Sequence, residues 1–229
     1  MGIVTIQEHT TTNPILMIGE EAGICWGADT TSPVGNYNRG MDCLRSGHFR
    51  AAEYPDVYMV LDGYSARLIR EFYTHIAGAP TRLQASTRYI DYEHGFDYII
   101  PHTVADNPEA KEIYLQNMYI TAENLRKLDE LGIPKEDSAN LLPLGMTTKV
   151  VVKMNFRTLM TMSNQRMCTR AYWEFRELMN DIANALCNYS VEWENLVKEF
   201  FMPKCEMLGV CPERYSCGMY PRREEKIWP

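Results

Sequence analysis

The sequence contains no apolar run of the length that a membrane-spanning helix requires, about 18–20 residues. It also lacks a basic excess, because 23 lysines and arginines stand against 30 aspartates and glutamates and give a formal net charge of -7. Residues 1–9 have no basic stretch before an apolar one, so we expect no secretory signal. These absences predict a cytoplasmic protein with no membrane partner and no broad nucleic-acid surface. A few local arginines can still hold an anionic small molecule.

A regular cysteine framework is missing as well. The seven cysteines are unevenly spread, and without an export signal we expect free or metal-bound thiols. The C-x5-C-x5-C series near the C-terminus is not the usual C-x2-C knuckle, which favours free thiols. The C-terminal segment that contains these cysteines has too little apolar content to fold by itself. The alternative is therefore a metal ion that cross-links the segment. Zinc or an iron–sulfur cluster would then be held by Cys168, Cys205, Cys211 and Cys217.

Repeats, low-complexity tracts and linkers are also absent, and 45% of the 229 residues are apolar, which is enough for a core. Short apolar and β-branched runs predict strands at 2–7, 56–61, 98–100 and 147–154. Apolar spacing and caps predict helices at 14–26, 41–46, 65–76, 107–131, 134–142, 156–166, 172–186 and 192–201. Residues 30–38 and most of 81–100 are expected to be irregular. The mixture predicts one α/β (α+β) domain over residues 1–203, with a central mixed sheet flanked by helices, and an irregular tail over residues 204–229.

Two segments carry chemistry. Pro80–Tyr89 is dense in arginine, serine and threonine, which are donors suited to phosphate and carbonyl groups. Taken alone, it is more typical of a solvated loop. In the second segment, Asn155, Leu159, Met162 and Arg166 share one face of a predicted helix, with a polar residue at each end. That face suits either an elongated ligand or the edge of a surface helix.

Together these segments resemble the flavin-dependent thymidylate synthase family. Residues 84–89, Gln-Ala-Ser-Thr-Arg-Tyr, are similar to the second half of its signature motif, RHRxxSxNExSxRY. Residues 142–144, 155–160, 166 and 173–174 follow the order of its C-terminal half: a proline turn, an N-x-R-S-L-M helix start, an arginine and a W-E pair. Residues 46–53 resemble its G-H-E-x-x-x-E-H stretch. The resemblance covers about residues 41–178.

The chain departs from the family in the RHR triplet. Thr74-His75 stands where the Arg-His begins, the closing arginine has no counterpart, and residues 78–80 are inserted nearby. Lys149 replaces a nucleotide-binding arginine. This replacement keeps the positive charge but loses the bidentate hydrogen bonding of a guanidinium. Glu71 falls near a family glutamine. The flavin half of the resemblance is therefore the more altered one.

The resemblance implies roles for particular residues. Arg166 holds the position of the catalytic arginine, which stabilises negative charge on the uracil ring so that C5 becomes a nucleophile. Residues implied to bind dUMP are Glu71, Gln84, Ala85, Ser86, Thr87, Arg88, Lys149 and Arg166. Residues implied to bind FAD are His48, Arg50, Thr74, His75, Gln84, Asn155, Arg157 and Thr161.

The implied reaction is the reductive methylation of dUMP to dTMP. Methylenetetrahydrofolate supplies one carbon, NADPH reduces FAD, and the reduced flavin supplies a hydride. The family also implies a homotetramer with shared active sites. Two alternatives are a relative that modifies another pyrimidine nucleotide, suggested by Glu71, and a non-catalytic dUMP-binding scaffold, suggested by the altered triplet.

Overall fold

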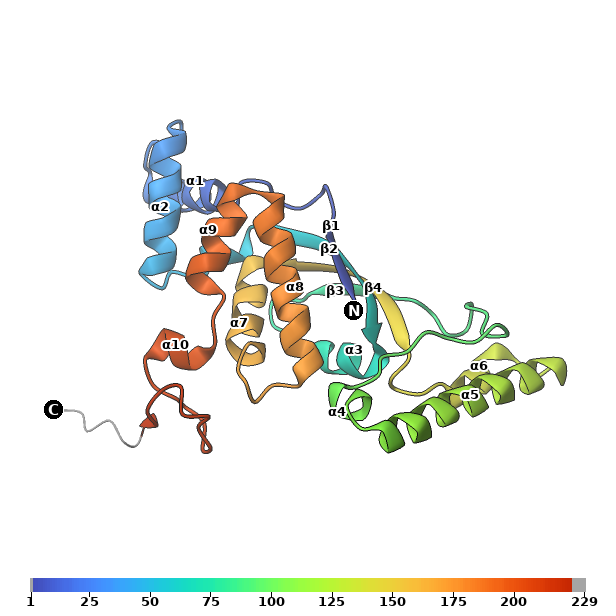
Figure 1. The fold of residues 1–229 in the computed structure, drawn as a ribbon. Coiled ribbons are helices and arrows are strands. Elements are labelled where there is room, and N and C mark those ends of the chain that lie inside the picture. The colour runs from blue at the N-terminus through green and yellow to red at the C-terminus, as the bar shows by residue number, and fades with distance from the viewer. Residues whose placement is uncertain (1, 224–229) are drawn as a thin grey trace. The chain divides into compact units, whose positions relative to one another are not determined.

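The structure is a computed structural model and describes residues 2–223. Its strands are β1 (Ile3–Ile6), β2 (Asp56–Ser65), β3 (Thr81–Gln84) and β4 (Thr147–Asn155) (Figure 1). Its helices are α1 (Pro14–Trp26), α2 (Pro33–Arg45), α3 (Ala66–Phe72), α4 (His102–Ala105), α5 (Pro108–Glu130), α6 (Lys135–Ser138), α7 (Phe156–Arg166), α8 (Trp173–Tyr189), α9 (Val191–Phe200) and α10 (Lys204–Leu208). Short 3-10 turns lie at Ala51–Glu53 and Ala139–Leu141. Between residues 2 and 223, no helix is long and apolar enough to cross a membrane.

The strands form one four-stranded sheet in the order β1-β2-β4-β3. In β2 and β4, buried side chains alternate with more exposed ones over most of the strand, the pattern of a sheet with one face in the core. Val57, Met59, Leu61, Val150 and Val152 are at most 1% exposed. One sheet combined with helices confirms the predicted α/β class.

The described residues divide into two compact units. Unit 1 holds residues 2–3, 61–74 and 82–151, and unit 2 holds residues 4–60, 75–81 and 152–223. All four strands contribute residues to both units. Unit 1 contains α3 to α6, and unit 2 contains α1, α2 and α7 to α10.

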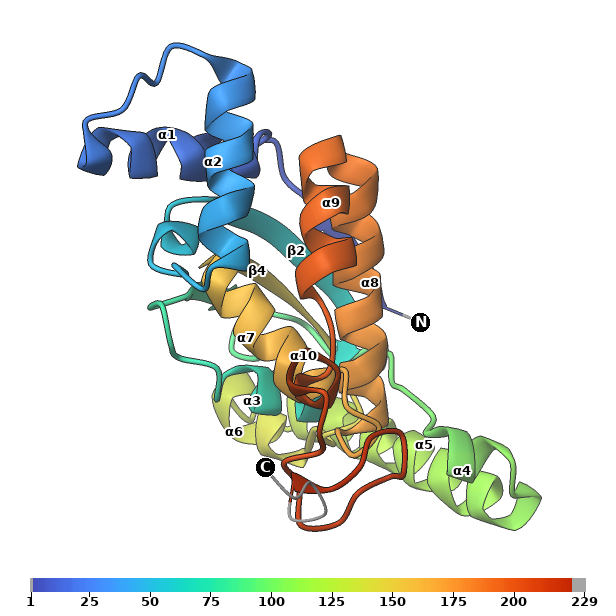
Figure 2. The same cartoon turned by 90° about the vertical axis from the view of Figure 1, so that its left-hand side faces the viewer.

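In unit 2, α1 packs against α2, and Figure 2 shows the two helices crossing. Their approach is so close that a Cβ added to Gly19 would lie 1.7 Å from the carbonyl oxygen of Asn36. The expectation of a loop over residues 30–38 and a helix only from 41 is therefore wrong. Ser32 caps α2 by accepting a bond from the Gly35 amide, and Pro33 occupies the first turn. The close contact with α1 also involves Gly40 of α2, where an added Cβ would lie 2.2 Å from the carbonyl oxygen of Ile15.

Three further expectations are corrected by the structure. Ser65 does cap α3, as predicted, but the helix ends at Phe72, so Tyr73 and Ile76 (73% exposed) do not join its buried face. Residues 81–84 are strand β3 rather than irregular chain, because they pair with β4. The strand expected at 98–100 is reduced to a single bridge between Tyr98 and Met146.

Several boundaries agree with the sequence. Helices α1 and α7 span the predicted residues, and α5 begins at Pro108 with the Asn107 side chain accepting from the Ala110 amide. The tail is more ordered than expected, because residues 204–208 form α10 and Cys211 bridges to Arg222.

Candidate functional site

Arg166 lies in the last turn of α7 and contacts two residues of unit 2. Its Nε donates a hydrogen bond of 2.9 Å to Nε2 of His75, which enters from a segment 91 positions earlier in the chain. Its guanidinium lies 4.6 Å from the centre of the Phe175 ring, and His75 meets the same ring edge-on at 5.5 Å. Because His75 accepts through Nε2, its neutral form carries the proton on Nδ1. The structure thus brings together the predicted catalytic arginine and a residue predicted to bind flavin.

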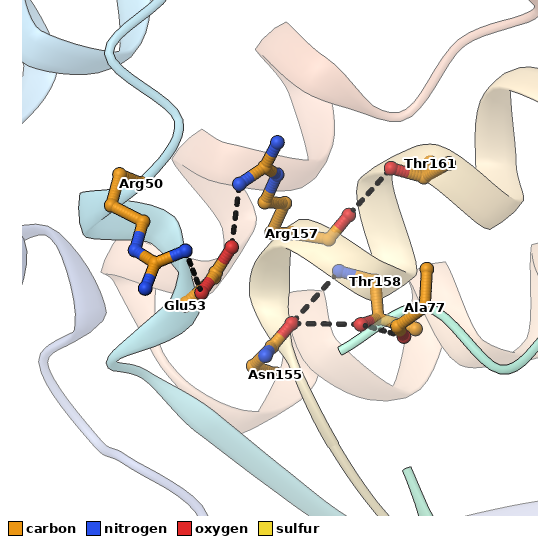
Figure 3. A network of polar contacts seen from close by, with 7 residues as sticks. All are labelled: Arg50, Glu53, Ala77, Asn155, Arg157, Thr158 and Thr161. Atoms are coloured by element: carbon orange, nitrogen blue, oxygen red, sulfur yellow. Dashed lines mark hydrogen bonds and ion pairs between the residues drawn. The ribbon is translucent and has the colours of Figure 1, made fainter. Parts of the chain in front are cut away.

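The start of α7 is held by a polar network shown in Figure 3. The Asn155 side chain caps the helix by accepting from the backbone amide of Thr158 at 2.9 Å. The Thr158 hydroxyl lies 2.8 Å from the Asn155 carbonyl oxygen and 2.9 Å from the carbonyl oxygen of Ala77. Gly78 has a φ of +76°, and an added Cβ would lie 2.2 Å from the Thr158 hydroxyl. The inserted residues therefore pack tightly onto the helix start.

Glu53 joins two of the residues predicted to bind flavin. Its carboxylate forms ion pairs with Arg157, on the first turn of α7, and with Arg50 at 3.5 Å (Figure 3). Both arginines are exposed, and so is His48, which follows the end of α2. The Thr161 hydroxyl donates to the Arg157 carbonyl one helical turn away at 2.9 Å. This part of unit 2 presents cations that are oriented by one shared carboxylate.

The residues predicted to bind nucleotide gather mainly in unit 1, where β3 meets β4. The Ala85 amide donates to the Lys149 carbonyl at 2.8 Å, and the Gln84 amide donates to the Thr148 hydroxyl at 3.4 Å. The next residues form a turn in which the Ser86 carbonyl accepts from Tyr89 and Ile90. The Ser86 hydroxyl also accepts from the amide of Arg88, two residues on. Sheet pairing and this turn therefore place Gln84 to Arg88 next to β4.

A pocket of about 590 Å³ opens beside this turn. Its lining comes from the segment after β3, from α5 and from β4: Asp62, Ala85, Ile90, Asp91, Tyr92, His94, Gly95, Phe96, Asp97, Tyr98, Met118, Tyr119, Ala122, Met146, Thr147, Thr148 and Lys149. Burial raises the pKa of the Tyr92 phenol, and a hydrogen bond from Lys135 lowers the pKa of the Asp91 carboxyl. Both Ala85 and Lys149 face the pocket, and its aromatic and charged lining suits a base and a phosphate.

Each of the two predicted phosphate-binding cations of unit 1 is paired with a carboxylate. Nζ of Lys149 lies 2.6 Å from Asp62 on β2, and Nη2 of Arg88 lies 3.0 Å from Glu136 on α6. All four side chains are about half exposed. Sequence reasoning missed both carboxylates, as it missed Phe175, because no local signal links them to their partners.

Two predicted residues are less well connected to this group. Glu71 lies on the last turn of α3 and does not line the pocket. The Thr74 hydroxyl donates to the carbonyl of Glu71 at 2.7 Å, so it serves the end of that helix. The structure does not bring either side chain to the pocket wall.

The metal alternative for the cysteines is corrected by the structure. No three histidine, cysteine, aspartate or glutamate side chains within residues 2–223 are grouped so that they could hold a metal ion. The four thiols do line one pocket of about 620 Å³ in unit 2. The tail is instead ordered by α10 and by backbone bonds of Cys211 to Pro221 and Arg223, so it needs no metal cross-link. Burial raises the pKa of the Cys205 thiol, which further disfavours a thiolate.

The sequence was compared with known families and proteins. The model of a family described as "Thymidylate synthase complementing protein" matches residues 10–189. A flavin-dependent thymidylate synthase from Nitratidesulfovibrio vulgaris is 33% identical over 194 residues, covering 79% of this chain and 75% of that protein. One from Thermococcus onnurineus is 32% identical, covering 80% and 76%.

Solved structures show the same fold at lower identity. The flavin-dependent thymidylate synthase of Helicobacter pylori, in complex with FAD and dUMP, matches with a TM-score of 0.66 at 19% identity. The match covers 84% of this chain and 98% of that one. A UMP/dUMP methylase from Streptomyces cacaoi bound with 5-Br dUMP has a TM-score of 0.71 at 13% identity, covering 88% and 96%. At these identities the likeness supports the fold alone.

Proposed function

The chain belongs to the flavin-dependent thymidylate synthase family, and we propose that it converts dUMP to dTMP by reductive methylation with FAD as cofactor. The observation that carries this proposal is Arg166. The resemblance assigns it the role of the family's uracil-polarising arginine, and its guanidinium contacts two side chains, His75 and Phe175. When C5 of uracil acts as a carbon nucleophile, negative charge develops on the ring. A fixed positive charge stabilises that negative charge.

We propose that unit 1 supplies the nucleotide's phosphate and base contacts. Arg88 and Lys149 carry the positive charge, and Ser86 and Thr87 offer hydroxyl donors beside them. Gln84, Ala85 and Glu71 complete the proposed set, with Glu71 on α3 as its least supported member. The turn at Ser86 supports the proposal because it places these donors next to the pocket lined by Ala85 and Lys149.

The chemistry of unit 2 fits a flavin dinucleotide. Arg50 and Arg157 are exposed cations of the kind that a pyrophosphate requires, and His48 is exposed beside them in sequence. The side-chain oxygen of Asn155 caps α7, so the side-chain NH₂ group is the donor that we propose for the cofactor. We propose His75, Thr74, Gln84 and Thr161 as the other contacts. When bound, the flavin supplies the hydride that completes the methyl group.

We further propose methylenetetrahydrofolate as the donor of the carbon and NADPH as the reductant. The overall balance is dUMP, methylenetetrahydrofolate, NADPH and a proton giving dTMP, tetrahydrofolate and NADP⁺. No protein thiol takes part in this balance. Cys168, the cysteine nearest to Arg166 in sequence, lies beyond the end of α7 and lines the pocket of about 620 Å³ in unit 2 together with Arg166.

We propose a homotetramer working in the cytoplasm. The exposure of α5 supports the assembly. This helix is 23 residues long but buries only Met118 and Leu125. Its side chains Ile113, Tyr119 and Ile120 are 64%, 68% and 47% exposed. Such a face is typical of a helix that a partner covers. Supporting the compartment, all seven cysteines are free thiols.

The test combines a spectrum with a product assay. The purified protein should show flavin absorption bands that change when dUMP is added, and it should form dTMP when folate donor and NADPH are supplied. UMP, tested in parallel, separates the dUMP reaction from modification of another pyrimidine nucleotide. A protein that binds dUMP but takes up no FAD would instead support the scaffold alternative.

A further inference from the structure

The two cations proposed to bind phosphate are held by carboxylates from distant parts of unit 1. Asp62 reaches Lys149 across neighbouring strands, and Glu136 reaches Arg88 from α6. The pocket next to them adds more negative charge, because Asp91 and Asp97 also line it. Among these carboxylates, Asp62 pairs with Lys149 itself, and Asp91 pairs with Lys135.

We propose that Asp62 and Glu136 compete with the substrate's phosphate for Lys149 and Arg88, and that this competition makes the site selective for a nucleoside monophosphate over di- and triphosphates. The inference rests on the proposed nucleotide-binding role of the two cations. It adds a specificity function for two residues that the family resemblance does not assign.

The exposure of the pairs supports exchange with a ligand. Their side chains are 48–63% exposed, so each pair is weak and can be broken by a competing anion. A monophosphate carries up to two negative charges and three acceptor oxygens, which lets it displace a single carboxylate. The displaced carboxylates stay close, however, and every additional phosphate group brings further negative charge toward them. The penalty therefore grows with the length of the phosphate chain.

The other charged groups around the pocket strengthen this selection. Asp91 is bonded to Lys135 at 2.6 Å, and this contact keeps the carboxylate ionised by lowering its pKa. His94 lines the pocket and pairs with its neighbour Glu93 at 3.0 Å. The pocket lining thus holds three carboxylates, Asp62, Asp91 and Asp97, and one lysine, Lys149.

The experiment is calorimetric titration of the flavin-loaded protein with dUMP, dUTP and deoxyuridine. The variants are Asp62→Asn and Glu136→Gln, which keep side-chain size. Two controls remove one carboxylate elsewhere. Asp56→Asn breaks the Asp56–Lys153 pair on the same two strands, and Glu130→Gln breaks a pair on α5.

We expect each site variant to bind dUMP about two- to five-fold more tightly, the range for an exposed charge pair. The gain for dUTP should be larger, so the preference for dUMP falls. Deoxyuridine affinity and both controls should stay at the wild-type value. Equal or weaker dUMP binding by the variants would overturn the inference and make the carboxylates positioning groups. Wild-type protein that binds no dUMP would refute the proposed function itself.

Discussion

Replacing Arg166 by lysine tests the central chemical claim. Lysine keeps the positive charge but has no N–H at the position of Nε and no planar group to lie over Phe175. It therefore loses both contacts that fix the guanidinium, the 2.9 Å bond to His75 and the 4.6 Å stacking distance to the ring. The charge would remain near the uracil without a defined direction.

The size of the effect follows from the role of a preorganised donor. Removing one such donor from a transition state costs roughly 10²- to 10³-fold in kcat, about 2.7–4 kcal/mol. We expect R166K to fall in that range, while the Kd for dUMP changes less than about ten-fold, because the proposed phosphate contacts of Arg88 and Lys149 are unchanged. Single-turnover formation of dTMP, with calorimetry for dUMP, separates the two quantities.

Arg176→Lys is the matched control. Arg176 lies on α8, and its guanidinium donates to the backbone carbonyl of Thr169. It should leave kcat unchanged. If R166K retained kcat within about three-fold of wild type, the directed guanidinium would not be the group that stabilises the ring charge.

Three further predictions address the support of the site. His75→Phe should lower kcat about ten-fold, since it removes a hydrogen bond to a charged group. His75→Gln, whose side chain can still accept from Arg166, should keep most of the wild-type rate. Equal rates for the two variants would contradict this. Gly78→Ala should destabilise the protein by about 1–3 kcal/mol in urea unfolding, because of its positive φ and a 2.2 Å clash, and Gly95→Ala, with positive φ but open space, should cost less. Glu199→Gln should lower the urea midpoint at neutral pH. The bond from Arg45 lowers the pKa of Glu199 below 4.5, so its contribution is present above pH 4.5 and is lost as the pH falls through the lowered value; the variant and wild type should then converge in acid.

The sequence predicted elements whose signals are local. Ser65 and Asn107 each cap a helix at the start that the pattern indicated, whereas Asn155, expected on one face of α7, is its N-cap. The start of α1 at Pro14 and the full span of α7 follow from the same rules. These signals lie within one helical turn of the boundary they set, so no tertiary knowledge is needed.

Two elements, β3 and the start of α2, were not predicted from the sequence. Residues 81–84 carry little apolar signal and become a strand because β4 offers an edge to pair with. Residues 33–38 contain the glycine and polar residues of a loop, yet they form the start of α2, which Ser32 caps and which packs closely on α1 at Gly19 and Gly40. For β3 the deciding partner lies far away in the sequence, beyond the reach of a local pattern. For α2 the local signal of Ser32 and Pro33 was present but was outweighed by the loop-like composition.

The same distinction holds in the site and affects how its mutants should be interpreted. The resemblance pointed to the cations, but the structure shows each against a partner from elsewhere: Arg166 with His75, Arg157 with Glu53, Arg88 with Glu136, Lys149 with Asp62. A ligand that reaches the last three has to displace a carboxylate, so binding is an exchange of partners rather than the addition of a contact. Removing one of these cations also leaves its carboxylate facing the ligand. The binding free energy lost in such a variant therefore contains repulsion by the remaining carboxylate as well as the lost attraction of the cation. Only a comparison with the variant that lacks both partners separates these two contributions.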